Sequence, residues 1–400
     1  MVEVLRVVVV GPLAQSASGF AADLSSRGYT PLSATNLVRV FADLSRWLQS
    51  RGLRPRDLRV ERLDEFLRSR RRRGFAHWTS MRGLDPLVDY LRRCSAVPPP
   101  RSAPPRTVLE RLLASYRAYL VSERALAEKT ILRRVQVAAR FLSDLDVSRA
   151  ALRDLSPVVV RKFLGTESRS RRYSAASMAL VGSDLRALLR FFFAEGRTRR
   201  SLAEAVPSSA GWRLTSLPRA VSRADVGKLL RSCDRRTAFG RRDFAILVLL
   251  VRLGLRAGEV LAIELDDIDW RAGEIVIHGK GAKRERLPLP ADVGKALSEY
   301  VLRRPRVIER RVFLRLRAPY RPLSAVQQIV FAASQRAGLP VIRPHRLRHT
   351  AATEMLRAGA RLAEIAQVLR HGSTQTTAIY AKVDRTALRT IAQSWPGARA

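Results

Sequence analysis

The sequence predicts a mainly α-helical protein with a small antiparallel β-sheet in its C-terminal part. Three observations support this fold class: apolar residues recur mostly at helical spacing, proline-rich segments separate the helical stretches, and one pair of β-rich runs flanks a glycine-containing turn. The chain has 400 residues, of which 46% are hydrophobic. This is enough for two or three packed domains, so we expect a globular protein rather than a disordered basic tail.

Two linkers divide the chain into three units. The first is "SAVPPPRSAPPR" at residues 95–106, whose prolines cannot continue a helix and favour an extended spacer. The second runs from about 203 to 222 and mixes Pro, Ser and Gly between two periodic segments. We therefore predict an extra N-terminal helical domain (1–98), a second helical domain (106–203) and a C-terminal domain (216–400).

The first two units present apolar anchors in the same order. Helical anchors recur 94 residues apart, as Leu37 and Ile131, Phe41 and Val135, Leu44 and Ala138, Trp47 and Phe141, and Leu48 and Leu142. Further on, "DLRVERLDEFL" corresponds to "DLSPVVVRKFL", and Leu87, Tyr90 and Leu91 correspond to Leu188, Phe191 and Phe192. Each unit is predicted to be a small all-α bundle, and both common ancestry and chance similarity remain open explanations.

An arginine-rich segment precedes the last helix of each of these two units. The segments are "RSRRRRG" at 68–74 and "SRSRRYSAAS" at 168–177, and we interpret both as connectors. A run of charge is usually a solvated face. Because Ser, Tyr and the nearby Trp78 are interleaved with the arginines, contact with phosphates is an equally open interpretation.

The charge of the whole chain indicates a polyanionic partner. Lys and Arg total 74 against 35 Asp and Glu, which gives a formal net charge of +39 and a pI near 11.7. Only seven of the basic residues are lysine, and such an arginine excess also arises from a GC-rich coding bias. Charge alone would also fit an RNA-binding protein, but no aromatic stacking motif is visible.

The C-terminal unit combines a buried helix with a hairpin. Ser222 and Asp225 resemble an N-cap arrangement, and the apolar helix "RRDFAILVLLVRLGL" follows. The stretch "IDWRAGEIVIHGKGAKRERLPLP" then predicts a small antiparallel hairpin. From Ser324 to the end the pattern is helical again, with breaks at Gly338 to Pro340, Gly359 and Gly372.

Neither the start of the chain nor its cysteines indicate secretion or membrane insertion. The apolar run in "MVEVLRVVVVGPL" is interrupted by Arg6 and is too short for a signal peptide. No segment approaches the ~20 apolar residues of a membrane helix. Cys94 and Cys233 lie far apart without metal-ligand spacing. We therefore expect a soluble, cytoplasmic protein without a disulfide framework.

The segment "PHRLRHTAATEMLRAG" (344–359) places two histidines and two arginines within five residues at the start of a predicted helix. His345 and His349 have the i, i+4 spacing of a helical zinc site. However, Arg346 and Arg348 lie between them where a metalloprotease would have a glutamate, and guanidinium groups repel a divalent cation. We therefore expect this turn to bind a phosphate, and we expect no metal.

Four segments together resemble the catalytic domain of tyrosine recombinases, the phage-integrase family. They are "GLRAGEVLAIELDDID", "GKGAKRERLPLP", "HRLRHTAATEML" and "LRHGSTQTTAIYAKV", in family order across residues 216–385. The second unit lies where that family has its SAM-like helical core-binding domain. The "AIYAKVD" segment and the chain length resemble recombinases of mobile elements, which implies DNA integration or excision by strand transfer.

The residue types in these segments suit attack on a phosphodiester. Arg256 and Arg348 would bind the non-bridging oxygens as planar forks. Tyr380 would be the nucleophile and His345 the base that removes its proton. Lys280, with Lys283 as its rival, would protonate the leaving 5′ oxygen.

Further residues would support these groups. We expect His371 to hydrogen-bond a phosphate oxygen, Glu259 to resemble the family's acidic residue that orients its neighbours, and His349 to give structural support. A covalent tyrosyl link conserves the bond energy, so no cofactor is implied. Two departures from the family pattern are Arg370, where glycine is common, and the small residues in "GLRAGEV".

The resemblance also implies partners. It implies a clamp on double-stranded DNA and a homotetramer assembled on two DNA sites, alone or with accessory recombinases. The last residues place Leu388, Ile391, Ala392 and Trp395 on one helical face, which docks either in a neighbouring protomer or on its own domain. A type IB topoisomerase and a catalytically silent DNA-binding regulator are the alternative functions.

Overall fold

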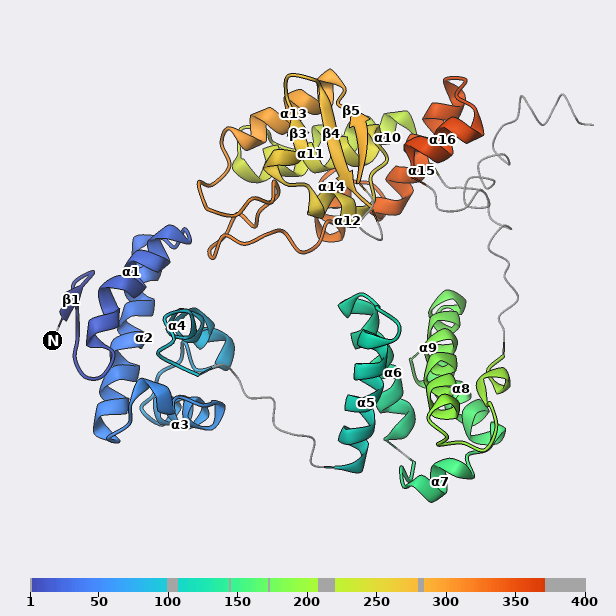
Figure 1. Cartoon of the computed structure of the whole chain (residues 1–400). Helices are drawn as coiled ribbons and strands as arrows, with labels where there is room; N and C mark the ends of the chain where they lie inside the picture. Colours follow the sequence, from blue (N-terminus) through green and yellow to red (C-terminus); the bar gives the residue numbers. More distant parts are fainter. Residues whose placement is uncertain are drawn as a thin grey trace, which may run out of the picture. The chain divides into compact units, whose positions relative to one another are not determined.

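The computed structural model describes residues 2–98, 107–143, 145–171, 173–207, 220–279 and 284–370 (Figure 1). By its contacts the chain divides into two compact units, one formed by Met1–Pro100 with Leu214–Ala400 and the other by Arg101–Arg213. The three-domain boundaries expected from the linkers stay a prediction. None of the described helices is long and apolar enough to cross a membrane.

The N-terminal residues form a β-hairpin and four long helices. Strand β1 (Val2–Val4) pairs antiparallel with β2 (Val7–Val9). The helices are α1 (Ala17–Ser26), α2 (Pro31–Ser50), α3 (Val60–Arg72) and α4 (Met81–Arg93). The prediction of an all-α first unit was therefore incomplete. The hairpin forms because β-branched valines favour extended backbone. All five α2 anchors predicted from spacing are buried in one core.

The first arginine-rich segment is not a connector, because α3 continues through it to Arg72. Arg70, in the last turns of α3, is buried and forms an ion pair with Asp43 of α2. Arg73 also reaches Asp43, at 3.0 Å. The solvated-face interpretation is therefore wrong for Arg70.

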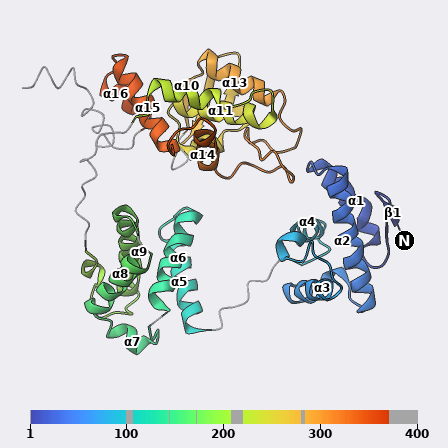
Figure 2. The ribbon, with the colours of Figure 1, turned by 180° about the vertical axis from the view of Figure 1, so that it is seen from behind.

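The second unit is a bundle whose helices α5, α6 and α9 lie side by side in both views (Figure 2). Its helices are α5 (Val108–Ser122), α6 (Glu128–Leu142), α7 (Arg149–Arg153), α8 (Pro157–Arg171) and α9 (Ala175–Ala194). Thr107 and Glu110 form a capping box that starts α5. The second arginine-rich segment is only partly a connector, since α8 reaches Arg171 and α9 begins at Ala175.

A buried ion pair ties α6 to α9. Asp184 of α9 is 1% exposed and accepts two hydrogen bonds from Arg133 of α6, at 2.7 and 2.9 Å. The anchors expected from the repeat, Phe141 and Leu142 on α6 with Phe191 and Phe192 on α9, are buried in the same core. The helical order of this bundle thus matches the prediction.

The C-terminal unit places a three-stranded antiparallel sheet beside helices (Figure 1). Its elements are α10 (Arg223–Arg231), α11 (Ala238–Arg252), α12 (Ala257–Ala262), β3 (Ile268–Asp269), β4 (Glu274–His278), β5 (Arg284–Pro288), α13 (Ala291–Val301), α14 (Gln327–Arg336), α15 (Pro344–Arg357) and α16 (Leu362–Val368). The strand order is β3-β4-β5, so the sheet contains the predicted hairpin and one further short strand, β3. Ser222 caps α10 by accepting a hydrogen bond from the Asp225 amide, as predicted.

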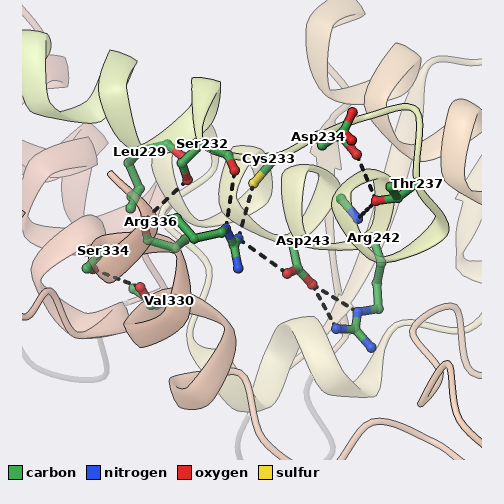
Figure 3. A network of polar contacts seen from close by, with 12 residues as sticks. Leu229, Ser232, Cys233, Asp234, Thr237, Arg242, Asp243, Val330, Ser334 and Arg336 are labelled. Atoms are coloured by element: carbon green, nitrogen blue, oxygen red, sulfur yellow. Dashed lines mark hydrogen bonds and ion pairs between the residues drawn. The ribbon is translucent and has the colours of Figure 1, made fainter. Parts of the chain in front are cut away.

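A polar network fixes α10, α11 and α14 against one another (Figure 3). Asp243 of α11 is buried and lies 2.8 Å from Arg242 and 3.5 Å from Arg336 of α14. Arg336 also donates from Nε to the carbonyl of Ser232, just after α10, at 3.2 Å. Cys233 is buried beside this network, and burial raises the pKa of its thiol. The network therefore holds α14 in a fixed position against α11.

Candidate active site

Among the predicted site residues that the structure describes, Arg348 is the most deeply buried. It lies on α15 with 2% of its surface exposed. Its Nη1 donates to the carbonyl of Gly254 at 2.6 Å, and its Nη2 donates to the carbonyl of Leu369. A buried guanidinium needs such acceptors, because an unpaired charge in the interior is costly. Arg348 therefore connects α15 to the turn before α12 and to the end of α16.

Gly254 lets the chain approach Arg348 closely. Its φ is +59°, in the left-handed region that favours glycine. A Cβ at this position would lie 2.5 Å from Cδ2 of Leu369 and 3.3 Å from Cβ of Ala351. The turn thus needs glycine both for its backbone conformation and for space.

Arg256 and Glu259 form a rigid pair at the start of α12. Arg256 is the N-cap residue, and its backbone amide donates to Oε2 of Glu259 at 2.8 Å. Its Nη1 donates to Oε1 of the same carboxylate at 2.6 Å. Glu259 is 4% exposed, whereas the Arg256 side chain is 42% exposed. Glu259 thus holds Arg256 from the interior while much of the Arg256 side chain stays accessible to solvent.

Glu259 remains ionised in this position. Burial alone would raise the pKa of its carboxyl, but the hydrogen bond from the Arg256 amide, together with Arg370 and the Arg256 guanidinium, lowers it below its ordinary value. Hydrogen bonds and nearby positive charge favour the charged form of a carboxylate. The negative charge of Glu259 is therefore a permanent part of the site at neutral pH.

Arg370 stood out in the sequence only as a departure from the family pattern, and its pairing with Glu259 was not predicted. Its side chain is 3% exposed, and its Nη2 donates to Oε2 of Glu259 at 2.8 Å. Its carbonyl accepts a hydrogen bond from Nη2 of Arg256 at 2.9 Å. The only signal in the sequence was an arginine at a position where glycine is common. The backbone explains that preference for glycine, because Arg370 has a φ of +54°.

His345 and His349 lie on adjacent turns of α15, with ring centroids 4.4 Å apart. Partial desolvation, Arg348 and Arg256 lower the pKa of His345 below its ordinary value. Desolvation, His345 and Arg348 lower the pKa of His349 to about 4. Both imidazoles are therefore neutral near pH 7, and a neutral imidazole can accept a proton.

Arg256, His345 and Arg348 line one cavity of about 440 Å³. Arg343, the N-cap residue of α15, and Gln327 of α14 complete its polar lining. Three arginines line this space, whereas Glu259, the carboxylate paired with Arg256, is not part of the lining. Such a cavity suits an anion with several oxygen atoms, such as a phosphodiester.

The structure tests the location of only some predicted residues. It brings together Arg256, Glu259, His345, Arg348 and His349 around or directly behind the cavity. Lys280, its rival Lys283, His371 and Tyr380 lie outside the described residues, as does the predicted tail helix. Within the described part of the chain, no group of three or more His, Cys, Asp or Glu side chains is arranged to hold a metal ion.

Comparison with known proteins places the chain in a family. The model of the "Phage integrase family" matches residues 219–386, and that of the "Phage integrase, N-terminal SAM-like domain" matches residues 113–196. The second match confirms the SAM-like domain expected in the middle of the chain. The first match contains all four segments that carried the resemblance.

Among curated relatives, "Putative integrase/recombinase y4rA" of Sinorhizobium fredii is 40% identical, covering 97% of this chain and 95% of the relative. "Tyrosine recombinase XerD" of Mycobacterium leprae is 31% identical, covering 72% of this chain and 97% of the relative.

Two solved structures share the fold. XerH recombinase bound to its difH substrate has a TM-score of 0.55 at 20% identity, covering 82% of this chain and 93% of XerH. A lambda integrase tetramer bound to a Holliday junction has a TM-score of 0.52 at 18% identity, covering 73% and 80%. With two domain matches and a relative aligned along nearly its whole length, this chain belongs to the phage integrase family of tyrosine recombinases.

Proposed function

We propose that this enzyme cuts and rejoins double-stranded DNA at specific sites through a 3′-phosphotyrosyl intermediate formed by Tyr380. The proposal rests on one observation: Arg256, Arg348 and a neutral His345 line the same cavity. This combination offers positive charge for a phosphate and a group that accepts a proton. Family membership supplies the reaction class, and integration or excision of a mobile element is the process we propose.

In the proposed first step, the phenolic oxygen of Tyr380 attacks the scissile phosphorus. A new ester bond to phosphorus forms while the bond to the 5′ oxygen breaks. The phenol proton passes to His345, and the 5′ oxygen takes a proton from Lys280. Arg256 and Arg348 bind the non-bridging oxygens as charge increases on them, and His371 adds a hydrogen bond. Glu259 and His349 hold these groups in place.

In the second step, a 5′-hydroxyl from a partner duplex attacks the tyrosyl ester. The new phosphodiester forms as the bond to Tyr380 breaks, so the number of high-energy bonds is unchanged. The reaction therefore requires no nucleotide cofactor. Positive side chains carry out the charge stabilisation for which other phosphoryl-transfer enzymes use metal ions.

We also propose that four protomers act together on two DNA sites in the cytoplasm. The lambda integrase structure, similar in fold, is a tetramer on a Holliday junction. The sequence of residues 386–400 supplies an amphipathic stripe for exchange between protomers. A chain truncated before Thr386 should then bind a single site but fail to assemble on two sites in gel filtration. Unchanged assembly on DNA would contradict exchange of this segment.

The covalent intermediate is the decisive test. A nicked suicide substrate built from the flanks of the coding locus should trap a protein–DNA adduct, and mass spectrometry should locate it on Tyr380. Tyr380→Phe should keep DNA affinity within about twofold and abolish the adduct, because only one hydroxyl is lost. An adduct that survives this substitution would refute the assignment. Supercoil relaxation without recombinant product would instead indicate a topoisomerase, and site-specific binding without any adduct would indicate a silent regulator.

A further inference from the structure

A second cavity, of about 630 Å³, lies on the N-terminal bundle between α2 and the loop that follows α3. One wall is a single face of α2, formed by residues at helical spacing: Asn36, Arg39, Val40, Asp43 and Arg46. The opposite wall is Arg70 and the loop from Gly74 to Trp78. None of these residues takes part in the proposed cleavage chemistry.

This cavity carries excess positive charge. Asp43 is 3% exposed and is approached by three guanidinium groups: Arg70, Arg73 at 3.0 Å and Arg46 at 3.7 Å. One carboxylate neutralises only one of them. Arg39 adds a further charge, since it forms no ion pair with any described residue and only donates to the amide oxygen of Asn36 at 3.1 Å. An anionic ligand would compensate this excess.

Arg70 gives a second, independent indication of a ligand. It is 4% exposed, and its guanidinium lies 4.2 Å from the centroid of the Phe75 ring. Its Nη1 is paired with Asp43 and its Nη2 donates to the carbonyl of His77 at 3.4 Å. Its Nε, however, is buried without a hydrogen-bond partner among the described residues. Buried donors without partners are rare in folded proteins, so this atom points to an acceptor supplied from outside.

The loop that closes the cavity is held in place. Arg71 donates from Nε and Nη2 to the carbonyl of Thr79, at 3.2 and 2.8 Å. Trp78 adopts a φ of +58°, a conformation that non-glycine residues rarely keep without support. Phe75 is 41% exposed at the edge of the loop. The cavity thus combines several arginines with a partly exposed aromatic residue, which suits the phosphate and deoxyribose of a DNA backbone.

We propose that this cavity binds a backbone phosphate of double-stranded DNA, so that the N-terminal unit is an additional DNA-contacting domain. Residues 1–98 contain 17 arginines, no lysine and nine acidic residues, and the rest of the chain is equally basic. An acidic protein segment is the competing ligand. Double-stranded DNA is favoured because the proposed function already brings it to this chain, and the choice of polymer rests on that function.

The test compares two double variants of the full chain. In R39A/R46A, two cations of the cavity are removed. In the control R62A/R68A, the same number of charges is removed from α3, but these arginines already pair with Glu65 at 2.9 Å and Asp64 at 3.2 Å. All four side chains lie on the surface of the same bundle. Thermal melting followed by circular dichroism should show both variants folded.

DNA affinity is measured between 50 and 200 mM salt on two duplexes: a short one limited to the core site and one extended on both sides. Each lost phosphate contact lowers the salt slope by about 0.9. Because the cavity is assigned one phosphate, the affinity of R39A/R46A for the extended duplex should fall about 3.5-fold less than that of the wild type over this fourfold change in salt. The control and the short duplex should show no difference.

Equal salt slopes for the wild type and R39A/R46A on the extended duplex would overturn the proposal, as would an equal effect in the control. A change in protomer assembly with unchanged DNA affinity would identify an acidic protein partner and would also overturn it. Adduct formation on the suicide substrate, measured with the same preparations, tests the cleavage function separately. A normal adduct with unchanged salt slopes would reject this cavity alone, and a missing adduct in the wild type would reject the cleavage proposal alone.

Discussion

Glu259→Gln tests the central ion-pair cluster of the catalytic domain. The wild-type carboxylate accepts hydrogen bonds from the Arg256 amide, from Nη1 of Arg256 and from Nη2 of Arg370, at 2.8, 2.6 and 2.8 Å. Glutamine keeps the shape but loses the charge, and its amide nitrogen would face at least one of these donors. Because Arg370 is 3% exposed, its charge would be left buried without compensation.

Loss of one partner from a buried pair typically costs about 3–5 kcal/mol, and we expect the free energy of unfolding to fall by this amount. The Arg256 contact adds little to it, because that side chain is 42% exposed and solvent screens its charge. Urea denaturation followed by tryptophan fluorescence measures the change. Glu274→Gln is the matched control: its partner Arg286, at 3.2 Å, is 74% exposed, so its loss should cost less than about 1 kcal/mol.

The same substitution should slow adduct formation, because Arg256 loses the acceptor that orients it. The wild type should also show an acid limit that Glu259→Gln lacks. The pKa of Glu259 is lowered in the folded state from an ordinary value of 4.5, so its stabilisation is complete above pH 4.5 and is lost as the pH falls through the lowered pKa. If Glu259→Gln matched Glu274→Gln in both stability and adduct rate, the assigned role of Glu259 would be wrong.

Three further outcomes follow from the same region. Arg370→Gly relieves a left-handed backbone worth about 1–2 kcal/mol but removes the partner of Glu259, so urea denaturation should show a net loss of about 2–3 kcal/mol; a net gain would contradict the pairing. The free energy of unfolding of the wild type should fall as the pH drops from 6.5 to about 4, because the folded state resists protonation of His349 in this range. His349→Gln should lack this part of the pH dependence. Identical acid titrations of the two proteins would exclude this role. Gly254→Ala should lower the melting temperature and weaken adduct formation, because its Cβ would lie 2.5 Å from Leu369; an unchanged melting temperature would show that the turn relaxes.

Local patterns predicted much of the C-terminal unit. The Ser222 cap, the apolar helix α11 and the helix breaks near Gly338 and Gly359 depend on neighbouring residues, and they lie where the sequence placed them. Strand β3 was missed because it has only two residues, Ile268 and Asp269, and forms by pairing with β4. Long-range pairing of this kind leaves no periodic signal in the sequence.

Charged residues were harder to place than apolar ones. A run of arginines suggested a surface connector, yet Arg70 is buried because Asp43, 27 residues earlier, provides its partner. Arg370 was likewise hidden, since its partner Glu259 is 111 residues away. By contrast, Arg256, His345 and Arg348 were found because the family segments specify them, and these residues share one cavity. The position of Tyr380 remains a prediction from sequence.

The hydrogen bond from Arg256 to the carbonyl of Arg370 has a consequence for timing. Arg370, which precedes His371, is joined through its backbone carbonyl to Arg256, the proposed phosphate ligand, and through its side chain to Glu259. Any displacement of the polypeptide leading to Tyr380 that shifts Arg370 would loosen Arg256 and Glu259 in the same movement. If Tyr380 acts as proposed, a displacement of Arg370 would therefore weaken phosphate binding by Arg256 in the same protomer.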